Sequence, residues 1–249
     1  MPVRLTRGTL VPVLLSLLVS VFTHVAPAPA QKKKQQRAQL SGSRFAVVVD
    51  ERLSVLREAP GFMGAPVQRL GRGRAVQLTG ARREADGAAF VQVAVTRRTR
   101  GWVQSESLAA PGRAGDDERL LRLVRGSEDF DRVERARLFL DTFPRSPHRP
   151  AVLLLLGEAT DAAAARLTRD AARRLDPREM EAGGAPLHSY FLNFNALDRY
   201  HRNGVGFVFD RATKQYAYDG AAWREILGRH PRSPEAVRAR ARLGAAAAK

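Results

Sequence analysis

The chain of 249 residues contains no cysteine. This absence excludes disulfide bonds, cysteine-liganded zinc sites, cysteine nucleophiles and the cysteine that carries a bacterial lipid anchor. Lysine is also scarce, because the 42 basic residues include only Lys32, Lys33, Lys34, Lys214 and Lys249. Long hydrophobic runs are limited to one, between Leu10 and Val25.

The net charge of +17 is carried almost entirely by arginine and is spread along the chain. Proteins that bind nucleic acid usually concentrate their basic residues, because neutralising phosphates drives that binding. We therefore expect no nucleic-acid partner. A uniformly arginine-rich soluble protein and a protein attracted to an anionic envelope surface remain the two interpretations of this charge.

The first thirty residues have the pattern of a signal peptide. Arg4 and Arg7 precede the apolar run, and Ala28-Pro29-Ala30 supplies the small residues of a cleavage site after Ala30. An uncleaved anchor is the alternative, but the run is shorter than the ~20 residues that a membrane-spanning helix needs. We expect a secreted or periplasmic protein with no stable membrane span after cleavage.

Residues 31–43 are polar and basic, so they predict a flexible linker or a tether to anionic lipid or wall polymer. Residues 44–110 then show short apolar runs, such as Phe45–Val49, separated by turn residues. Val91, Val93 and Val95 alternate with other residues, as on one face of a strand. This segment predicts a small closed β-barrel.

Four runs in this segment resemble the bacterial SH3-like domain: Leu53-Ser54-Val55, the stretch Pro66–Leu78, Phe90-Val91-Gln92-Val93 and Gly101-Trp102-Val103. The chain departs from the family at Ser54-Val55-Leu56, where Asn-Val-Arg is common. Its loop from Arg82 to Ala89 is also longer and more charged. The resemblance implies a module that binds cell-wall peptide or an envelope protein.

The candidate ligand-binding residues are Trp102, Arg97, Arg98, Arg100 and Phe90. Trp102 either lines a binding groove or packs in the barrel core. The three arginines either pair with carboxylates of an acidic ligand or are solvated at a hairpin tip.

Residues 116–249 change to a helical period. Asp116-Asp117-Glu118 places acids in the first turn of a helix, and Ser127 is predicted to cap a second helix from Glu128 to Phe143. The turn Phe143-Pro144-Arg145-Ser146-Pro147 recurs as His230-Pro231-Arg232-Ser233-Pro234. In each copy the first proline ends one helix, Ser146 or Ser233 is predicted to cap the next, and Pro147 or Pro234 occupies its first position.

A Leu-Gly pair follows each of these turns, ending at Gly157 and Gly244. The repeated unit resembles the tetratricopeptide-like helical hairpins of bacterial envelope proteins, which implies a surface that contacts proteins. Helices that only pack together, without a partner, are the alternative.

Aromatic residues gather between the two copies. Phe207–Asp210 and Gln215–Tyr218 alternate around a short connection, which predicts a β-hairpin near 207–218. Whether the aromatics form a core or a ligand surface stays open. They are Tyr190, Phe191, Phe194, Tyr200, Phe207, Phe209, Tyr216, Tyr218 and Trp223.

Catalytic patterns are few. The histidines show no i, i+4 metal pair, and no Gly-x-Ser-x-Gly elbow or phosphate loop is present. We expect no metal, no cofactor and no enzymatic activity. The alternative is a cell-wall hydrolase with a carboxylate pair drawn from Glu179, Glu181 and Asp198.

The predicted fold class is an all-β small SH3-like barrel at 44–110 followed by a mostly α-helical, tetratricopeptide-like domain at 116–249. The predicted function is that of an exported, non-enzymatic binding or scaffold protein of the bacterial cell envelope. Its expected partners are cell-wall peptide, bound by the SH3-like domain, or an envelope protein. The sequence leaves the oligomeric state open.

Overall fold

The computed structural model describes residues 44–174, 195–210, 213 and 215–247. The predicted signal peptide at 1–30, the predicted linker at 31–43 and the candidate acids Glu179 and Glu181 lie outside the described residues. Within the described part, no helix is long and apolar enough to cross a membrane.

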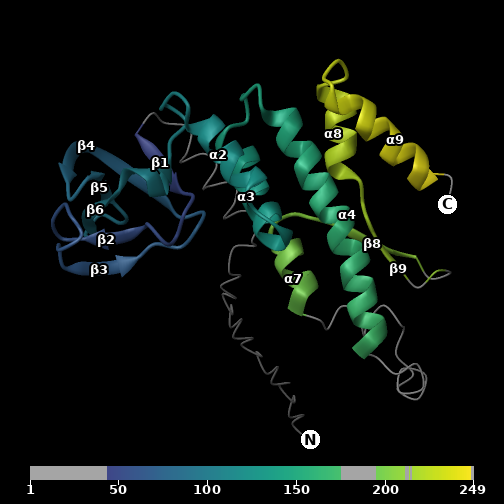
Figure 1. Ribbon diagram of the computed structural model, residues 1–249, viewed down its shortest axis with the longest axis horizontal. Helices are drawn as coiled ribbons and strands as arrows, with labels where there is room; N and C mark the ends of the chain where they lie inside the picture. The colour runs from purple at the N-terminus through teal and green to yellow at the C-terminus, as the bar shows by residue number, and fades with distance from the viewer. Residues whose placement is uncertain (1–43, 175–194, 211–212, 214, 248–249) are drawn as a thin grey trace, which may run out of the picture.

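The N-terminal part forms one seven-stranded antiparallel sheet with the strand order β3-β2-β6-β5-β4-β1-β7. The sheet lies on one side of the helices, at the left in Figure 1. Strand β7 leads through a short turn into helix α2 (Asp116–Arg125). The strands are β1 (Phe45–Val48), β2 (Val55–Arg57), β3 (Pro66–Arg69), β4 (Ala75–Ala85), β5 (Ala88–Ala94), β6 (Arg100–Gln104) and β7 (Leu108–Ala109), with the 3-10 turn η1 (Ser105–Ser107) before β7.

The predicted fold class, an all-β barrel followed by a separate helical domain, is wrong. The molecule is an α+β protein whose sheet contributes to the helical core. Ala46 and Val48 pack within the sheet, whereas Val47 and Val49 pack with the helices. Since successive strand residues point to opposite faces, β1 joins both cores. The apolar run that predicted a barrel strand is apolar on both faces because both faces are covered.

The segment from Arg82 to Ala89, predicted as a loop, is an extension of the β4–β5 hairpin. Arg82 pairs with Val91 and Ala85 with Ala88. The turn consists of Asp86 and Gly87, whose φ angles are 51° and 74°. Asp-Gly is a favoured pair in two-residue hairpin turns that need positive φ at both positions, so the local signal was present in the sequence.

Six helices lie in the described part of the chain. Helices α3 and α4 form one antiparallel hairpin, α8 and α9 form another, and α4 packs against α8. The long helix α4 therefore runs through the middle of the helical part (Figure 1). The helices are α2 (Asp116–Arg125), α3 (Asp129–Thr142), α4 (Arg149–Arg174), α7 (Asn195–Arg202), α8 (Ala221–Arg229) and α9 (Glu235–Ala247).

Two capping predictions had different outcomes. Ser146 Oγ accepts a hydrogen bond from the His148 N–H at 3.1 Å, as a cap at the start of α4 would. Ser127 does not cap α3, whose N-cap residue is Glu128 without a side-chain cap. The Ser127 hydroxyl instead donates to the Leu123 carbonyl at the end of α2.

The aromatics of the C-terminal part lie mostly in the core. Strands β8 (Phe207–Asp210) and β9 (Gln215–Tyr218) pair as an antiparallel hairpin at the residues where the sequence predicts one. Tyr200 is fully buried and contacts Phe130 edge-on at a centroid distance of 5.0 Å. Trp223 is also buried, against Gly157 of α4. Tyr190, Phe191 and Phe194 lie outside the described residues.

Candidate functional site

Two of the predicted ligand-binding residues, Arg100 and Trp102, point to the same face of the sheet, because they alternate along β6. Cross-strand partners also share a face. Trp102 lies opposite Gln92 of β5 and Arg57 of β2. This face, which we call the outer face, is opposite the one on which Val93 and Val103 form the inner core of the sheet.

A groove of about 570 Å³ lies on the outer face. Arg100 pairs with Ala94, which pairs with Gln77 of β4, so these side chains form one row across three strands. Beside this row, the register of β4 and β5 shifts between Leu78 and Arg82. The groove is lined by Arg44, Gln77, Leu78, Thr79, Gly80, Ala94 and Arg100.

Arg97 and Arg98 do not line this groove. They lie exposed in the turn between β5 and β6. Thr96 organises that turn, since its hydroxyl oxygen accepts hydrogen bonds from the N–H groups of Arg98 and Thr99 at 3.2 and 2.9 Å. The three predicted arginines are therefore divided between a groove wall and a solvated tip.

Phe90 is buried, with 1% of its surface exposed. It lies beneath Phe62, whose ring contacts it edge-on at a centroid distance of 5.6 Å. The loop that carries Phe62 is fixed by the Asp86 carboxylate, which accepts a hydrogen bond from the Phe62 N–H at 2.7 Å. Phe90 thus supports the β2–β3 loop from below.

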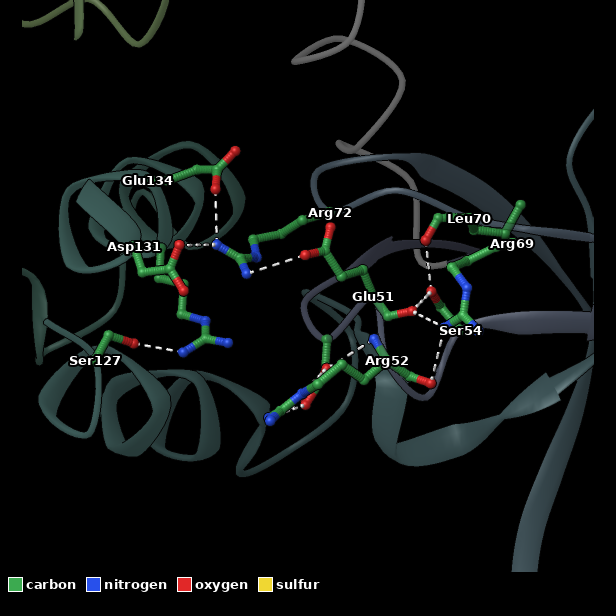
Figure 2. Close-up of polar contacts among 11 residues, drawn as sticks. Glu51, Arg52, Ser54, Arg69, Leu70, Arg72, Ser127, Asp131 and Glu134 are labelled. Carbon is green, nitrogen blue, oxygen red and sulfur yellow. Dashed lines mark hydrogen bonds and ion pairs between the residues drawn. The ribbon is translucent and has the colours of Figure 1, made fainter. Parts of the chain in front are cut away.

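A second polar cluster joins the sheet to helix α3 (Figure 2). Arg72, which follows β3, donates to Glu134 at 2.7 Å and to Asp131 at 3.2 Å, and lies 3.5 Å from Glu51. Only 8% of the Arg72 side chain is exposed. Asp131 and Glu134 stand one turn apart on α3, so a single guanidinium reaches both.

Arg135 is buried and donates to the Ser127 hydroxyl at 2.5 Å. Burial, together with the neighbouring charge of Arg72, lowers the pKa of Arg135. The pKa of Asp50 falls below its usual range although burial acts to raise it, because Arg52 donates to the carboxylate through its side chain and backbone. The ion pairs and hydrogen bonds of this cluster therefore link the sheet to the helices.

Neither Arg72 nor Arg44 was predicted to belong to a site. The partners of Arg72 on α3 are 59 and 62 residues away in the sequence. No local pattern predicts such a contact. The spacing of Asp131 and Glu134 on one helix face was the single available sign of a cation-binding surface.

Of the three carboxylates predicted as a possible catalytic pair, only Asp198 lies in the described part of the chain. Asp198 is exposed on α7, and no group of metal-ligating side chains occurs among the described residues. Asp161 on α4 is the carboxyl group whose pKa is raised, because burial disfavours its charged form and Glu158 adds repulsion. No family model, curated protein or solved structure matches the chain.

Proposed function

We propose that this protein is an exported, non-enzymatic binding or scaffold protein of the bacterial cell envelope. The outer face of its sheet holds an anionic wall component, and its helical part contacts a protein partner. One observation carries the proposal: the paired outward positions of strands β4, β5 and β6 carry no carboxylate. These positions are Gln77, Arg83, Ala85, Ala88, Phe90, Gln92, Ala94, Arg100, Trp102 and Gln104.

Arginine side chains on such a face favour carboxylate or phosphate ligands, because the guanidinium fork donates paired hydrogen bonds to both. Amides and a partly exposed indole beside them add hydrogen bonding and flat apolar contact. The peptides of bacterial cell walls carry carboxylates, so a wall component matches this chemistry. The signal-peptide pattern of residues 1–30 supports the compartment.

The test is co-sedimentation of residues 31–249 with purified peptidoglycan at low and high salt. We expect the protein to pellet at low salt and to be partly released by salt. Arg83→Gln/Arg100→Gln should reduce pelleting. The control Arg145→Gln/Arg232→Gln removes the same charge from exposed turns of the helical part and should leave pelleting unchanged.

An equal loss of pelleting in both double variants would show that binding depends on net charge alone and would contradict a site on the sheet. Absence of pelleting would refute wall binding. Zymography on peptidoglycan tests the non-enzymatic part, because a cleared zone that persists in a highly purified sample would show hydrolase activity.

A further inference from the structure

We propose that the groove between Arg44 and Arg100 is a binding site for the carboxylate groups of an acidic peptide. The inference rests on the proposed function and assigns it a site and a ligand chemistry. The groove differs from the rest of the outer face in having a cation on each side and small residues at its base.

Arg100 stands at one end of a cross-strand row, and Arg44 lies next to the other end, because Phe45, the residue after Arg44, pairs with Gln77. Arg100 is on β6, and Ala94 and Gln77 follow on β5 and β4. Arg44 precedes β1, and its carbonyl accepts a hydrogen bond from the Leu78 N–H at 2.7 Å. At about 4.8 Å per strand the two backbones are roughly 14 Å apart. Both long side chains can therefore reach toward a ligand held between them.

The space between the arginines is kept open by small residues. Ala94 has only a methyl group, and Gly80 has none. A Cβ atom added at Gly80 would meet no atom within 4 Å, so the volume above this glycine is empty. Gly80 also has a φ of 96°, which glycine adopts without steric cost. The interrupted β4–β5 register thus forms the base of the groove.

Both arginines are free to take a ligand. In the described part of the chain, neither the Arg44 nor the Arg100 side chain makes an ion pair or a hydrogen bond. Arg72 and Arg149, in contrast, are nine-tenths buried and bound to carboxylates. Gln77 adds an amide on the groove wall, and Leu78 adds an apolar surface.

The spacing of the two backbones that carry the arginines, roughly 14 Å, favours a peptide over a phosphate. A phosphate group concentrates its charge at one point, whereas two carboxylates along a peptide are spaced and can each meet one guanidinium. The volume of about 570 Å³ lies within the range of sites that hold small ligands. A short acidic peptide segment satisfies both conditions.

The test is fluorescence anisotropy of residues 31–249 with a labelled peptide that carries two glutamates, compared with the same peptide carrying glutamines. We expect binding of the glutamate peptide only. Arg44→Gln and Arg100→Gln should each weaken it about tenfold, since each removes one charge-assisted contact. Ala94→Leu should weaken it as well, by filling the groove without changing charge. Arg98→Gln is the matched control, because it removes an exposed charge from the adjacent turn.

Unfolding curves for each variant separate loss of the site from loss of the fold. Equal binding of both peptides, or equal weakening by Arg98→Gln, would overturn the inference. Inorganic phosphate that displaces the peptide at equal concentration would assign the groove to phosphate instead. If the protein pellets with peptidoglycan but does not bind the glutamate peptide, the groove inference is wrong and the proposed function stands. If it binds the peptide but does not pellet, wall binding fails and the groove stands.

Discussion

Gly157 and Gly244 occupy the same position in the two helical hairpins but have different surroundings. A Cβ atom at Gly157 would lie 2.3 Å from Trp223 Cζ2, whereas one at Gly244 would meet no atom within 4 Å. We expect Gly157→Ala to lower the free energy of unfolding by about 2–3 kcal/mol through overpacking. Gly244→Ala should raise it by about 0.5–1 kcal/mol, because alanine favours helix. Urea denaturation of both variants is the measurement, and effects of the same sign would contradict the close approach of Trp223.

Asp161 gives a pH-dependent prediction at the same scale. Burial is the main cause that raises the pKa of this carboxyl above 3.8, with Glu158 adding to it, while Arg242 and the Trp223 indole oppose the shift. The folded state therefore holds the proton more tightly than the unfolded chain does. The contribution of the protonated Asp161 carboxyl to the free energy of unfolding is fully present below pH 3.8. It is lost as the pH rises through the raised pKa of the folded state.

Asp161→Asn keeps an oxygen that accepts a hydrogen bond from Trp223 and has no charge to bury. We expect the variant to be more stable than the parent at neutral pH and equal to it below the ordinary pKa of aspartate. Unfolding curves between pH 3 and pH 7 provide the measurement. A stability difference that does not change with pH would show that ionisation of Asp161 is not its cause. Asp198→Asn, at an exposed acid on α7, is the control.

Among the elements, three helices meet at Arg149. Its side chain donates to Glu225 of α8 at 2.9 and 2.5 Å and to the Leu140 carbonyl of α3 at 3.0 Å. We expect Arg149→Met to cost about 2–3 kcal/mol, because the change leaves a buried carbonyl without a donor and leaves Glu225 with only the exposed Arg229, at 3.6 Å. This is below the usual range for a fully buried pair, since 26% of the Glu225 side chain is exposed.

A double-mutant cycle with Glu225→Gln measures the coupling directly. The exposed pair Arg122–Glu118 on α2 is the control, and its disruption should cost less than about 0.5 kcal/mol. Equal costs for the two pairs would argue against a specific joint between the hairpins.

The elements themselves were predictable where the signal is local. A proline follows the last turn of α3 and of α8, because proline cannot continue a helix. A Ser-Pro pair precedes α4 and α9, because proline fits the first turn of a helix. The β8–β9 hairpin follows from alternation. The β4–β5 extension was missed although Asp86-Gly87 signals it, because the charged residues around it also fit a loop. Ser127 was assigned to the wrong helix end because its hydroxyl has two possible backbone partners.

At the scale of the whole molecule, prediction failed where contacts are long-range. The apolar run of β1 predicts a strand with both faces buried but not which element covers each face, so the sheet was assigned to a closed barrel. Of the candidate site, Arg100 was assigned to the hairpin tip with Arg97 and Arg98, whereas it lies on β6 and shares a face with Trp102. Arg44 could not be added, because only the pairing of β1 with β4 brings it to the groove.

The shared core predicts how the molecule unfolds. Val47, Val49 and Ala109 of the sheet pack with Leu120 and the rest of the helical core, and Arg72 ties the β3–β4 connection to α3. Separate domains would unfold in two steps, whereas a common core couples them. We therefore expect a single transition by calorimetry, with equal calorimetric and van't Hoff enthalpies.

The isolated fragment 44–110 extends this prediction. Without the helices it exposes Val47, Val49 and Ala109, which are fully buried in the intact chain. Since each buried valine contributes about 1.5–3 kcal/mol, their exposure removes a large part of the stability of so small a unit. We expect the fragment to lack cooperative unfolding and dispersed amide signals.

Arg72→Met in the full chain should keep one unfolding transition at a lower temperature. A folded fragment, or two transitions in this variant, would show that the sheet is an independent domain.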